Sequence, residues 1–230
     1  MLIKENIEKV KEIISRACAR VGRNPEEVLV VAVTKNVEVP RILEAIEAGI
    51  QVIGENRVQE ALPKYQIIGN QVSWHMIGHL QTNKVKKALQ FADMIQSVDS
   101  LHLAHELQKQ AEKVNRDVDI LIEVNTSGEP TKFGFKPEET LSAIEEISRY
   151  PRLHIKGLMT IGAFLPDPEQ VRPCFVLLRQ LKEQLVQKNL PAVEMKYLSM
   201  GMTDDFEVAI EEGSNMVRIG RAIFGERPVH

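Results

Sequence analysis

The sequence contains little cysteine, with only Cys18 and Cys174 among its 230 residues. Two scattered cysteines do not form the disulfide framework of a small secreted protein. The sequence also lacks an apolar run of the roughly 18–20 residues that would span a bilayer. Its N-terminal segment, MLIKENIEKVKEI, is charged and amphipathic, unlike a secretory signal. These absences favour a cytoplasmic protein that does not enter a membrane.

No excess charge of one sign is present, because 29 basic residues balance 32 acidic ones. Such a balance argues against a surface built to bind nucleic acid. No GxGxxG motif follows the first predicted strand, which counts against a dinucleotide-binding sheet. No linker rich in proline, glycine or serine divides the chain. We therefore expect one domain over residues 1–230.

What is present is a regular alternation of short apolar runs and helical periodicity. An amphipathic helix is predicted over residues 3–21, where apolar side chains recur at helical spacing. Continuous β-branched runs such as VLVVAV suit strands that are buried on both faces. The eight predicted strands cover residues 28–35, 51–56, 73–80, 93–100, 117–128, 153–162, 194–202 and 214–220.

A predicted helix follows each of these strands. The helices cover residues 40–49, a stretch ending near 69, a stretch from 82, residues 101–114 with Ser100 as N-cap, a stretch from 137, and residues 168–189, 204–212 and 221–225. Strict alternation implies a parallel sheet with right-handed crossovers. Eight units in about 200 residues favour an α/β fold closed into a (β/α)8 barrel over a doubly wound sheet.

Functional sites of such barrels lie at the carboxyl ends of the strands. Lys35 follows the most apolar predicted strand. Burial there would disfavour its ammonium form and leave more free amine, which is the form that attacks an aldehyde to make a Schiff base. The alternative is a lysine that simply extends from the strand end into solvent.

Arg218 lies inside the apolar strand NMVRIG. A buried arginine is costly unless it is paired. It therefore forms either a structural ion pair, with Glu123 or Asp99 as candidates, or a contact to a ligand. Because arginine only donates hydrogen bonds, a pyridine nitrogen that faced it would have to accept and so stay unprotonated.

The loops after the seventh and eighth strands, SMGMTDD and RIGRAIFG, occupy the usual phosphate site of this architecture. Backbone N–H groups at the start of each following helix suit a phosphate dianion. Gly201 and Gly220 permit close approach of the backbone, and Ser199 and Thr203 add hydroxyl groups. Ordinary tight turns are the alternative explanation for the two glycines.

Other polar residues have simpler explanations or remain open. The four histidines His75, His79, His102 and His105 have spacing too loose for a metal site, and we expect no metal. The segment 126–135 is a long loop after the fifth strand. It either covers the mouth of the barrel, with Lys132 near an anion, or is solvated.

Five segments of the chain resemble the pyridoxal phosphate homeostasis protein family: VAVTKN (31–36), GENRVQE (54–60), WHMIGHLQTNK (74–84), GLMTIG (157–162) and LSMGMTDDFEVAIEEGSNMVRIGRAIFGER (198–227). The resemblance runs along nearly the whole chain. It implies the fold type III barrel shared with the barrel domain of alanine racemase, and pyridoxal 5′-phosphate as the cofactor.

The resemblance also implies which residues contact the cofactor. Lys35 is expected to form the Schiff base, and Arg218 is expected to face the cofactor ring. Asn56, in the GEN motif, is expected close to the cofactor. Ser199, Thr203 and Gly220 are expected to hold the phosphate, and Gly201, from the glycine-bearing loop described above, is also counted among the cofactor-binding residues.

Enzymes of this fold type add a C-terminal β-domain and a second catalytic group, often tyrosine or cysteine, on the other face of the ring. This chain ends at His230, and none of Tyr65, Tyr150 and Tyr197 falls at a strand end. We therefore predict no catalytic residues, and a protein that buffers and delivers pyridoxal 5′-phosphate. The absent dimerising domain favours a monomer, and apoenzymes or a regulatory protein are candidate partners.

Two alternatives stay open at this point. One is an amino-acid racemase that acts through the same Schiff base. The other is a class I aldolase-type barrel, which would hold a phosphorylated substrate on a lysine and lack the pyridoxal chromophore.

Overall fold

In the computed structural model, which describes residues 2–226, eight parallel strands close into a barrel in the order β1 to β8. The strands are β1 (Leu29–Val33), β2 (Val52–Glu55), β3 (Ser73–Met76), β4 (Met94–Val98), β5 (Val118–Glu123), β6 (Leu153–Met159), β7 (Val193–Ser199) and β8 (Met216–Ile219). The prediction of a (β/α)8 barrel is confirmed, and all eight predicted strands are found.

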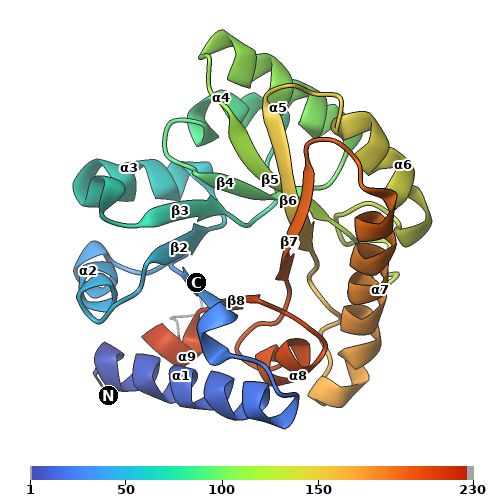
Figure 1. The fold of residues 1–230 in the computed structure, drawn as a ribbon. Helices are drawn as coiled ribbons and strands as arrows, with labels where there is room; N and C mark the ends of the chain where they lie inside the picture. The colour runs from blue at the N-terminus through green and yellow to red at the C-terminus, as the bar shows by residue number, and fades with distance from the viewer. Residues whose placement is uncertain (1, 227–230) are drawn as a thin grey trace.

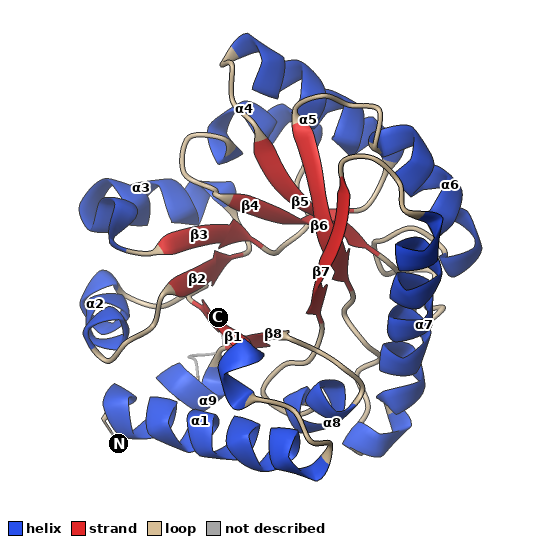
Figure 2. Ribbon diagram, in the orientation of Figure 1, coloured by secondary structure: helices blue, strands red, loops and turns tan. Residues whose placement is uncertain are grey.

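Helices surround the strands on the outside of the barrel (Figure 2). They are α1 (Ile3–Arg20), α2 (Val39–Glu47), α3 (Val58–Ile68), α4 (Val85–Ala88), α5 (Leu101–Lys113), α6 (Pro137–Ile147), α7 (Arg172–Lys188), α8 (Phe206–Glu211) and α9 (Arg221–Phe224). The predicted N-cap is confirmed, since the Ser100 hydroxyl accepts a hydrogen bond from the Leu103 amide. The helix predicted from residue 82 is only a 3₁₀ turn, Thr82–Lys84, followed by the single turn α4.

The predicted strands extend too far at their carboxyl ends. The fifth was predicted to reach residue 128, and β5 ends at Glu123. The reason is visible just beyond it, where the Asn125 amide donates to the Phe135 carbonyl of the following loop instead of to a neighbouring strand. Residues with strand-like composition thus leave the sheet here and form the loops at the rim of the barrel.

The predicted N-terminal helix is present and belongs to the outer ring of helices. It packs against α2, α8 and α9 (Figure 1). The Asn6 side-chain amide donates to the Ile223 carbonyl of α9, and Arg20 pairs with Glu207 and Glu211 of α8. Among residues 2–226, β8 is followed by the short α9, and α1 packs beside it, near the side of the barrel where β1 and β8 pair.

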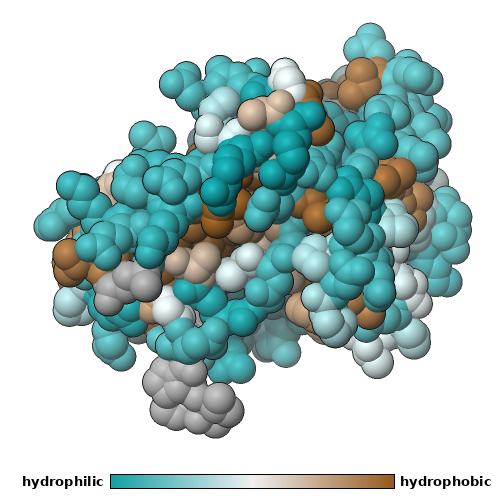
Figure 3. Space-filling view, turned by 90° about the horizontal axis from the view of Figure 1, so that it is seen from below, coloured by the Kyte–Doolittle hydropathy of each residue, from teal (hydrophilic) through white to brown (hydrophobic). Residues whose placement is uncertain are grey.

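The apolar core has two layers. The larger lies between the strands and the helices, and the smaller fills the barrel interior. The interior layer consists of Val31, Val33, Val52, Ile77, Met94, Leu121, Met159 and Met216. Seen from the side of α1, the outer surface is largely hydrophilic (Figure 3). Within residues 2–226, no helix combines the length and apolarity that crossing a membrane requires.

Candidate functional site

A tight turn follows β1 at the carboxyl rim of the barrel. Thr34 is fully buried, whereas Lys35 and Asn36 are exposed. Asn36 has a positive φ of 56°, a conformation that asparagine tolerates better than most residues. The prediction that Lys35 is desolvated is wrong, because burial along this strand ends one residue before it.

A cavity of about 240 Å³ opens beside this turn, between the carboxyl ends of β1, β7 and β8. Four of the predicted site residues line it together: Lys35, Thr203, Arg218 and Gly220. Phe164 and the rest of the loop after β6 contribute apolar side chains to the opposite wall. Closure of the barrel brings these residues into one cavity although β1 and β8 lie at opposite ends of the sequence.

Arg218 is buried, with 4% of its surface exposed. It pairs in register with Val31 across the β1–β8 junction. Its guanidinium donates to the Ser199 hydroxyl and to the Thr160 carbonyl, each at 2.7 Å. Its hydrogen-bond partners are thus neutral groups, and among the described residues no aspartate or glutamate comes within ion-pair distance of it, so the structural ion pair that was one of the two alternatives is not formed there. Burial lowers the pKa of Arg218 to about 10, which leaves it charged at neutral pH.

Ser199 lies in the barrel interior and links Arg218 to a further polar pair. Its hydroxyl donates to Gln96 Oε1 at 2.6 Å while it accepts from Arg218. The amide nitrogen of Gln96 in turn lies 2.8 Å from Nδ1 of His75. Burial lowers the pKa of His75 to about 4, so this imidazole is neutral. A continuous chain of hydrogen bonds therefore crosses the barrel from β3 to β8.

Close packing around Gly201 restricts which residue can occupy the loop after β7. Gly201 has a φ of 93°, and a Cβ atom there would lie 2.6 Å from Cβ of Ala209. Thr203 follows, and its hydroxyl accepts a long hydrogen bond of 3.4 Å from the Ala222 amide. This contact joins the loop after β7 to the start of α9, directly beyond Gly220.

Asn56 lies apart from this cavity and lines a neighbouring one of about 250 Å³ with Arg57, His79 and Lys84. Its Oδ1 atom is buried without a hydrogen-bond partner among the described residues. The structure therefore places Asn56 on the same rim as Lys35 but in a separate hollow.

Two buried polar residues of the interior were not predicted as cofactor-binding residues from the sequence, although Glu123 was considered there as an ion-pair partner of Arg218. Gln96 is one of them, and the only signal was a polar residue in the middle of the apolar run MIQSV. Glu123 is the other, at the carboxyl end of β5 with 4% of its surface exposed. Burial, reinforced by the Asp99 carboxylate and opposed by Arg218, raises the pKa of Glu123 to about 8. This carboxyl is therefore largely protonated at neutral pH.

The long loop after β5 folds back over the rim. Phe133 stacks on the imidazole of His79, with ring centroids 3.7 Å apart, and Nδ1 of His79 lies 2.6 Å from Asp99. Lys132 donates to Glu129 and to the Gly162 carbonyl. The loop thus contacts the segments that follow β3 and β6 at the carboxyl rim.

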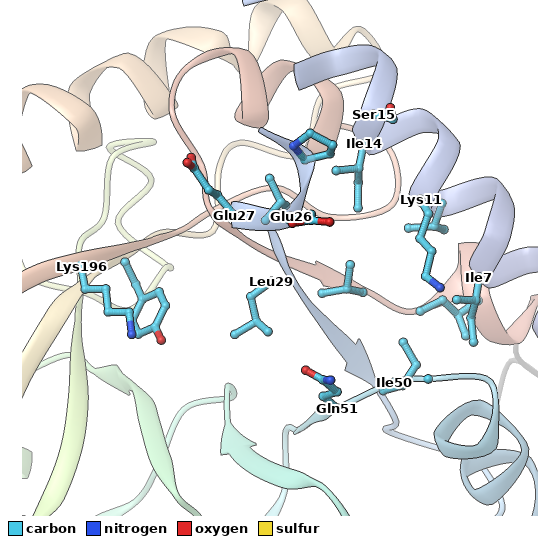
Figure 4. A pocket seen from close by; sticks show the side chains of 17 residues that line it. Ile7, Lys11, Ile14, Ser15, Glu26, Glu27, Leu29, Ile50, Gln51 and Lys196 are labelled. Carbon is cyan, nitrogen blue, oxygen red and sulfur yellow. The ribbon is translucent and has the colours of Figure 1, made fainter. Parts of the chain in front are cut away.

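A larger cavity of about 660 Å³ lies at the amino end of the barrel. Figure 4 shows Leu29 between Lys196 on one side and Lys11 of α1 on the other, with Gln51 and Glu27 at its edges. None of the site residues predicted from the sequence lines this cavity.

Comparison with known proteins agrees with this geometry. Residues 3–228 match the family model described as the alanine racemase N-terminal domain, so the chain belongs to this class of barrel proteins. The pyridoxal phosphate homeostasis protein of Aquifex aeolicus is 45% identical over 224 residues, which cover 97% of each chain. The chain therefore belongs to the pyridoxal phosphate homeostasis protein family.

Solved structures show the same barrel. A crystal structure of an unknown protein from Bifidobacterium adolescentis matches with a TM-score of 0.91 and 36% identity, covering 96% of this chain and 94% of that one. PipY of Synechococcus elongatus, solved with pyridoxal phosphate bound, matches with a TM-score of 0.81 and 32% identity, covering 93% of this chain and 100% of that one.

Proposed function

We propose that this protein binds pyridoxal 5′-phosphate at the carboxyl ends of β1, β7 and β8, covalently through Lys35, and that it buffers and delivers the cofactor. The observation that carries the proposal is the cavity that Lys35 and Arg218 line together with Thr203 and Gly220. The Lys35 amine suits an aldehyde, the Arg218 guanidinium suits a ring nitrogen, and Thr203 and Gly220 suit a phosphate. Relatives named for pyridoxal phosphate homeostasis and the PipY structure with the cofactor support the same ligand.

The residues of the cavity divide between the two ends of such a ligand. The buried guanidinium of Arg218 offers donors that stay charged, which suits an unprotonated pyridine nitrogen. The Thr203 hydroxyl and the backbone at Gly220 suit the phosphate, because they lie on adjoining loops that the Ala222 amide joins. Ser199 contributes through Arg218, since its hydroxyl is already engaged with Arg218 and Gln96. When bound, the cofactor supplies an aldehyde that a lysine amine can hold reversibly.

A role in binding without turnover has support in where the tyrosine and cysteine side chains lie. The Tyr65 hydroxyl is engaged in a hydrogen bond at the outer end of α3, and Tyr150 packs at the end of α6. Tyr197 lines the cavity at the amino end of the barrel. Cys18 and Cys174 are buried in α1 and α7. A second base of these residue types at the rim, which a two-base racemase needs, would have to come from outside the described residues of this chain.

Reduction with borohydride tests the attachment directly. We expect the protein mixed with pyridoxal 5′-phosphate to become yellow, and mass spectrometry after reduction and digestion to find the adduct on Lys35. Lys35→Ala should lose both the visible absorbance and the adduct, whereas Lys84→Ala, at the neighbouring cavity, should keep them. An adduct on another lysine would contradict the assignment.

A search for racemase activity separates the carrier from its main alternative. We expect no racemisation above background when the loaded protein is incubated with single amino acids. Saturable racemisation that disappears in Lys35→Ala would show an enzyme.

A further inference from the structure

A cluster of buried charges lies directly beneath the turn that carries Lys35. Lys64 of α3 is 8% exposed, and Glu55 at the end of β2 is fully buried. The Lys64 ammonium lies 2.8 Å from Glu55 and 2.7 Å from Glu60, which is four residues earlier on the same helix. Burial raises the pKa of the Glu55 carboxyl, and the adjacent Lys64 opposes this rise. Burying such charges costs free energy that only good pairing offsets, so their position calls for an explanation.

All three members of the cluster are hydrogen-bonded to the turn on either side of Lys35. Before Lys35, the Lys64 ammonium donates to the Thr34 carbonyl at 2.7 Å, and the Thr34 hydroxyl donates to Glu55 at 2.6 Å. After Lys35, the backbone amide of Asn36 donates to Glu60 at 2.5 Å. The charged groups therefore hold the peptide units that flank Lys35.

The turn also includes one residue with a special backbone conformation. Asn36 has a φ of 56°, in the left-handed region that asparagine tolerates better than most residues do. Within the turn, the Val37 amide donates to the Thr34 carbonyl, which also accepts from Lys64. Hydrogen bonds to charged groups are stronger than those between neutral groups, so these contacts favour one conformation of the turn.

We propose that Lys64, Glu55 and Glu60 are positioning residues, which hold the turn after β1 so that the Lys35 amine meets the cofactor aldehyde. This inference rests on the proposed function. In the attachment, the Lys35 nitrogen forms a C=N bond to the aldehyde carbon, and the carbonyl oxygen leaves as water with both amine hydrogens. The cluster contacts the backbone of the turn and takes no part in these transfers.

A pair of ligands separates positioning of Lys35 from general support of the cavity. Pyridoxal 5′-phosphate can attach to Lys35, whereas pyridoxine 5′-phosphate has an alcohol in place of the aldehyde and cannot. We expect Lys64→Met to weaken binding of the aldehyde about tenfold or more, as loss of one charged hydrogen bond predicts. Binding of the alcohol should change less than about twofold, the small effect expected for a group that does not contact it.

Three further variants sharpen the test. Glu60→Gln keeps a side-chain oxygen for the Asn36 amide, so it should lose less aldehyde affinity than Glu60→Ala. Lys156→Met removes an ion pair of similar length but greater exposure, the 2.7 Å contact to Glu194, at a site away from the turn. It should leave the binding of both ligands unchanged.

Amide hydrogen exchange measures how firmly the turn is held, without any ligand. Exchange at Asn36 should be faster in Lys64→Met and Glu60→Ala than in the natural protein, while amides of β5 keep their protection.

Equal weakening of the binding of both ligands in a folded Lys64→Met protein would show a general structural role and overturn the inference. No change in the binding of either ligand would overturn it as well. If Lys64→Met does not fold, the comparison of Glu60→Gln with Glu60→Ala decides. Absence of the adduct in the natural protein would instead disprove the proposed function.

Discussion

The cavities at the two ends of the barrel differ in size and in the polar groups that line them. The cavity at the amino end is larger, about 660 Å³ against about 240 Å³ at the carboxyl end. Its floor is largely apolar, with Leu29 and Ile50 beside Tyr197. The smaller cavity instead has the buried guanidinium of Arg218 in its wall, and Lys35 at its edge.

The size of the amino-end cavity has a structural origin in the sheet. Strands β7 and β8 pair at Ser199, the last residue of β7, and Met216, the first residue of β8, so β7 extends beyond β8 toward the amino end of the barrel. The register of β7 against β6 also shifts at Gly157, where a Cβ atom would lie 2.0 Å from the Tyr197 carbonyl oxygen. The stagger of β8 against β7 and this register shift are consistent with the space at the amino end. Buried polar groups, which cost free energy unless they are bonded, support the proposal that the cofactor site lies at the carboxyl end.

Among substitutions at the two ends of the barrel, Arg218→Met should have the largest effect on cofactor affinity. This change removes the donors to Ser199 and Thr160 and the charged group that faces the cavity. We expect cofactor affinity to fall about 100-fold, as loss of charged hydrogen bonds predicts. Because an apolar side chain avoids the desolvation of a buried charge, the free energy of unfolding should change by less than about 2 kcal/mol.

Spectroscopic titration with pyridoxal 5′-phosphate measures the affinity of this variant, and denaturant unfolding measures its stability. Lys35→Ala serves as the reference for complete loss of attachment. Unchanged affinity in Arg218→Met would remove the main reason for placing the ring at the carboxyl end.

A change of intermediate size should come from Glu123→Gln, at the carboxyl end of β5. Burial raises the pKa of Glu123 to about 8 in the folded protein, above its value of about 4.5 in the unfolded chain. The stabilisation from the protonated form is therefore complete below about pH 4.5 and is lost as pH rises through 8. Between pH 6 and 9 the natural protein should lose a few kcal/mol more than Glu123→Gln.

The measurement is the free energy of unfolding at several pH values for both proteins. Glu194→Gln, which removes an exposed carboxylate, provides the control and should follow the natural protein over this range. Parallel curves for the natural protein and Glu123→Gln would show that Glu123 is ionised at neutral pH.

The smallest effect should come from Lys196→Ala at the amino end. Lys196 is exposed and lies over the ring of Tyr197, 4.9 Å from its centroid. We expect cofactor affinity within about twofold of the natural value and a stability change within about 0.5 kcal/mol. A tenfold loss of affinity, measured by the same titration, would instead place the cofactor in the larger cavity.

Much of the carboxyl-end site could be predicted from the sequence, because barrel architecture directs attention to strand ends. Lys35 and Arg218 were selected in this way, and the structure brings them into one cavity with Thr203 and Gly220. The position of Asn56 in a neighbouring hollow could not be predicted, because it depends on the direction in which the loop after β2 leaves the rim. Strand ends were also placed too far along the chain, since composition does not report where sheet pairing stops.

By itself, the sequence determined the order of strands and helices and, through their number and spacing, the class of barrel. Apolar periodicity is a local property, so it can be read along the chain without knowledge of the fold. Only the tertiary structure decided which polar groups meet. It showed Lys35 exposed, and it placed the Lys64 ammonium between Glu55 and the Thr34 carbonyl, beneath the turn that presents Lys35. Such contacts depend on how α3 packs beside β1 and β2, and packing joins residues that are distant in the sequence.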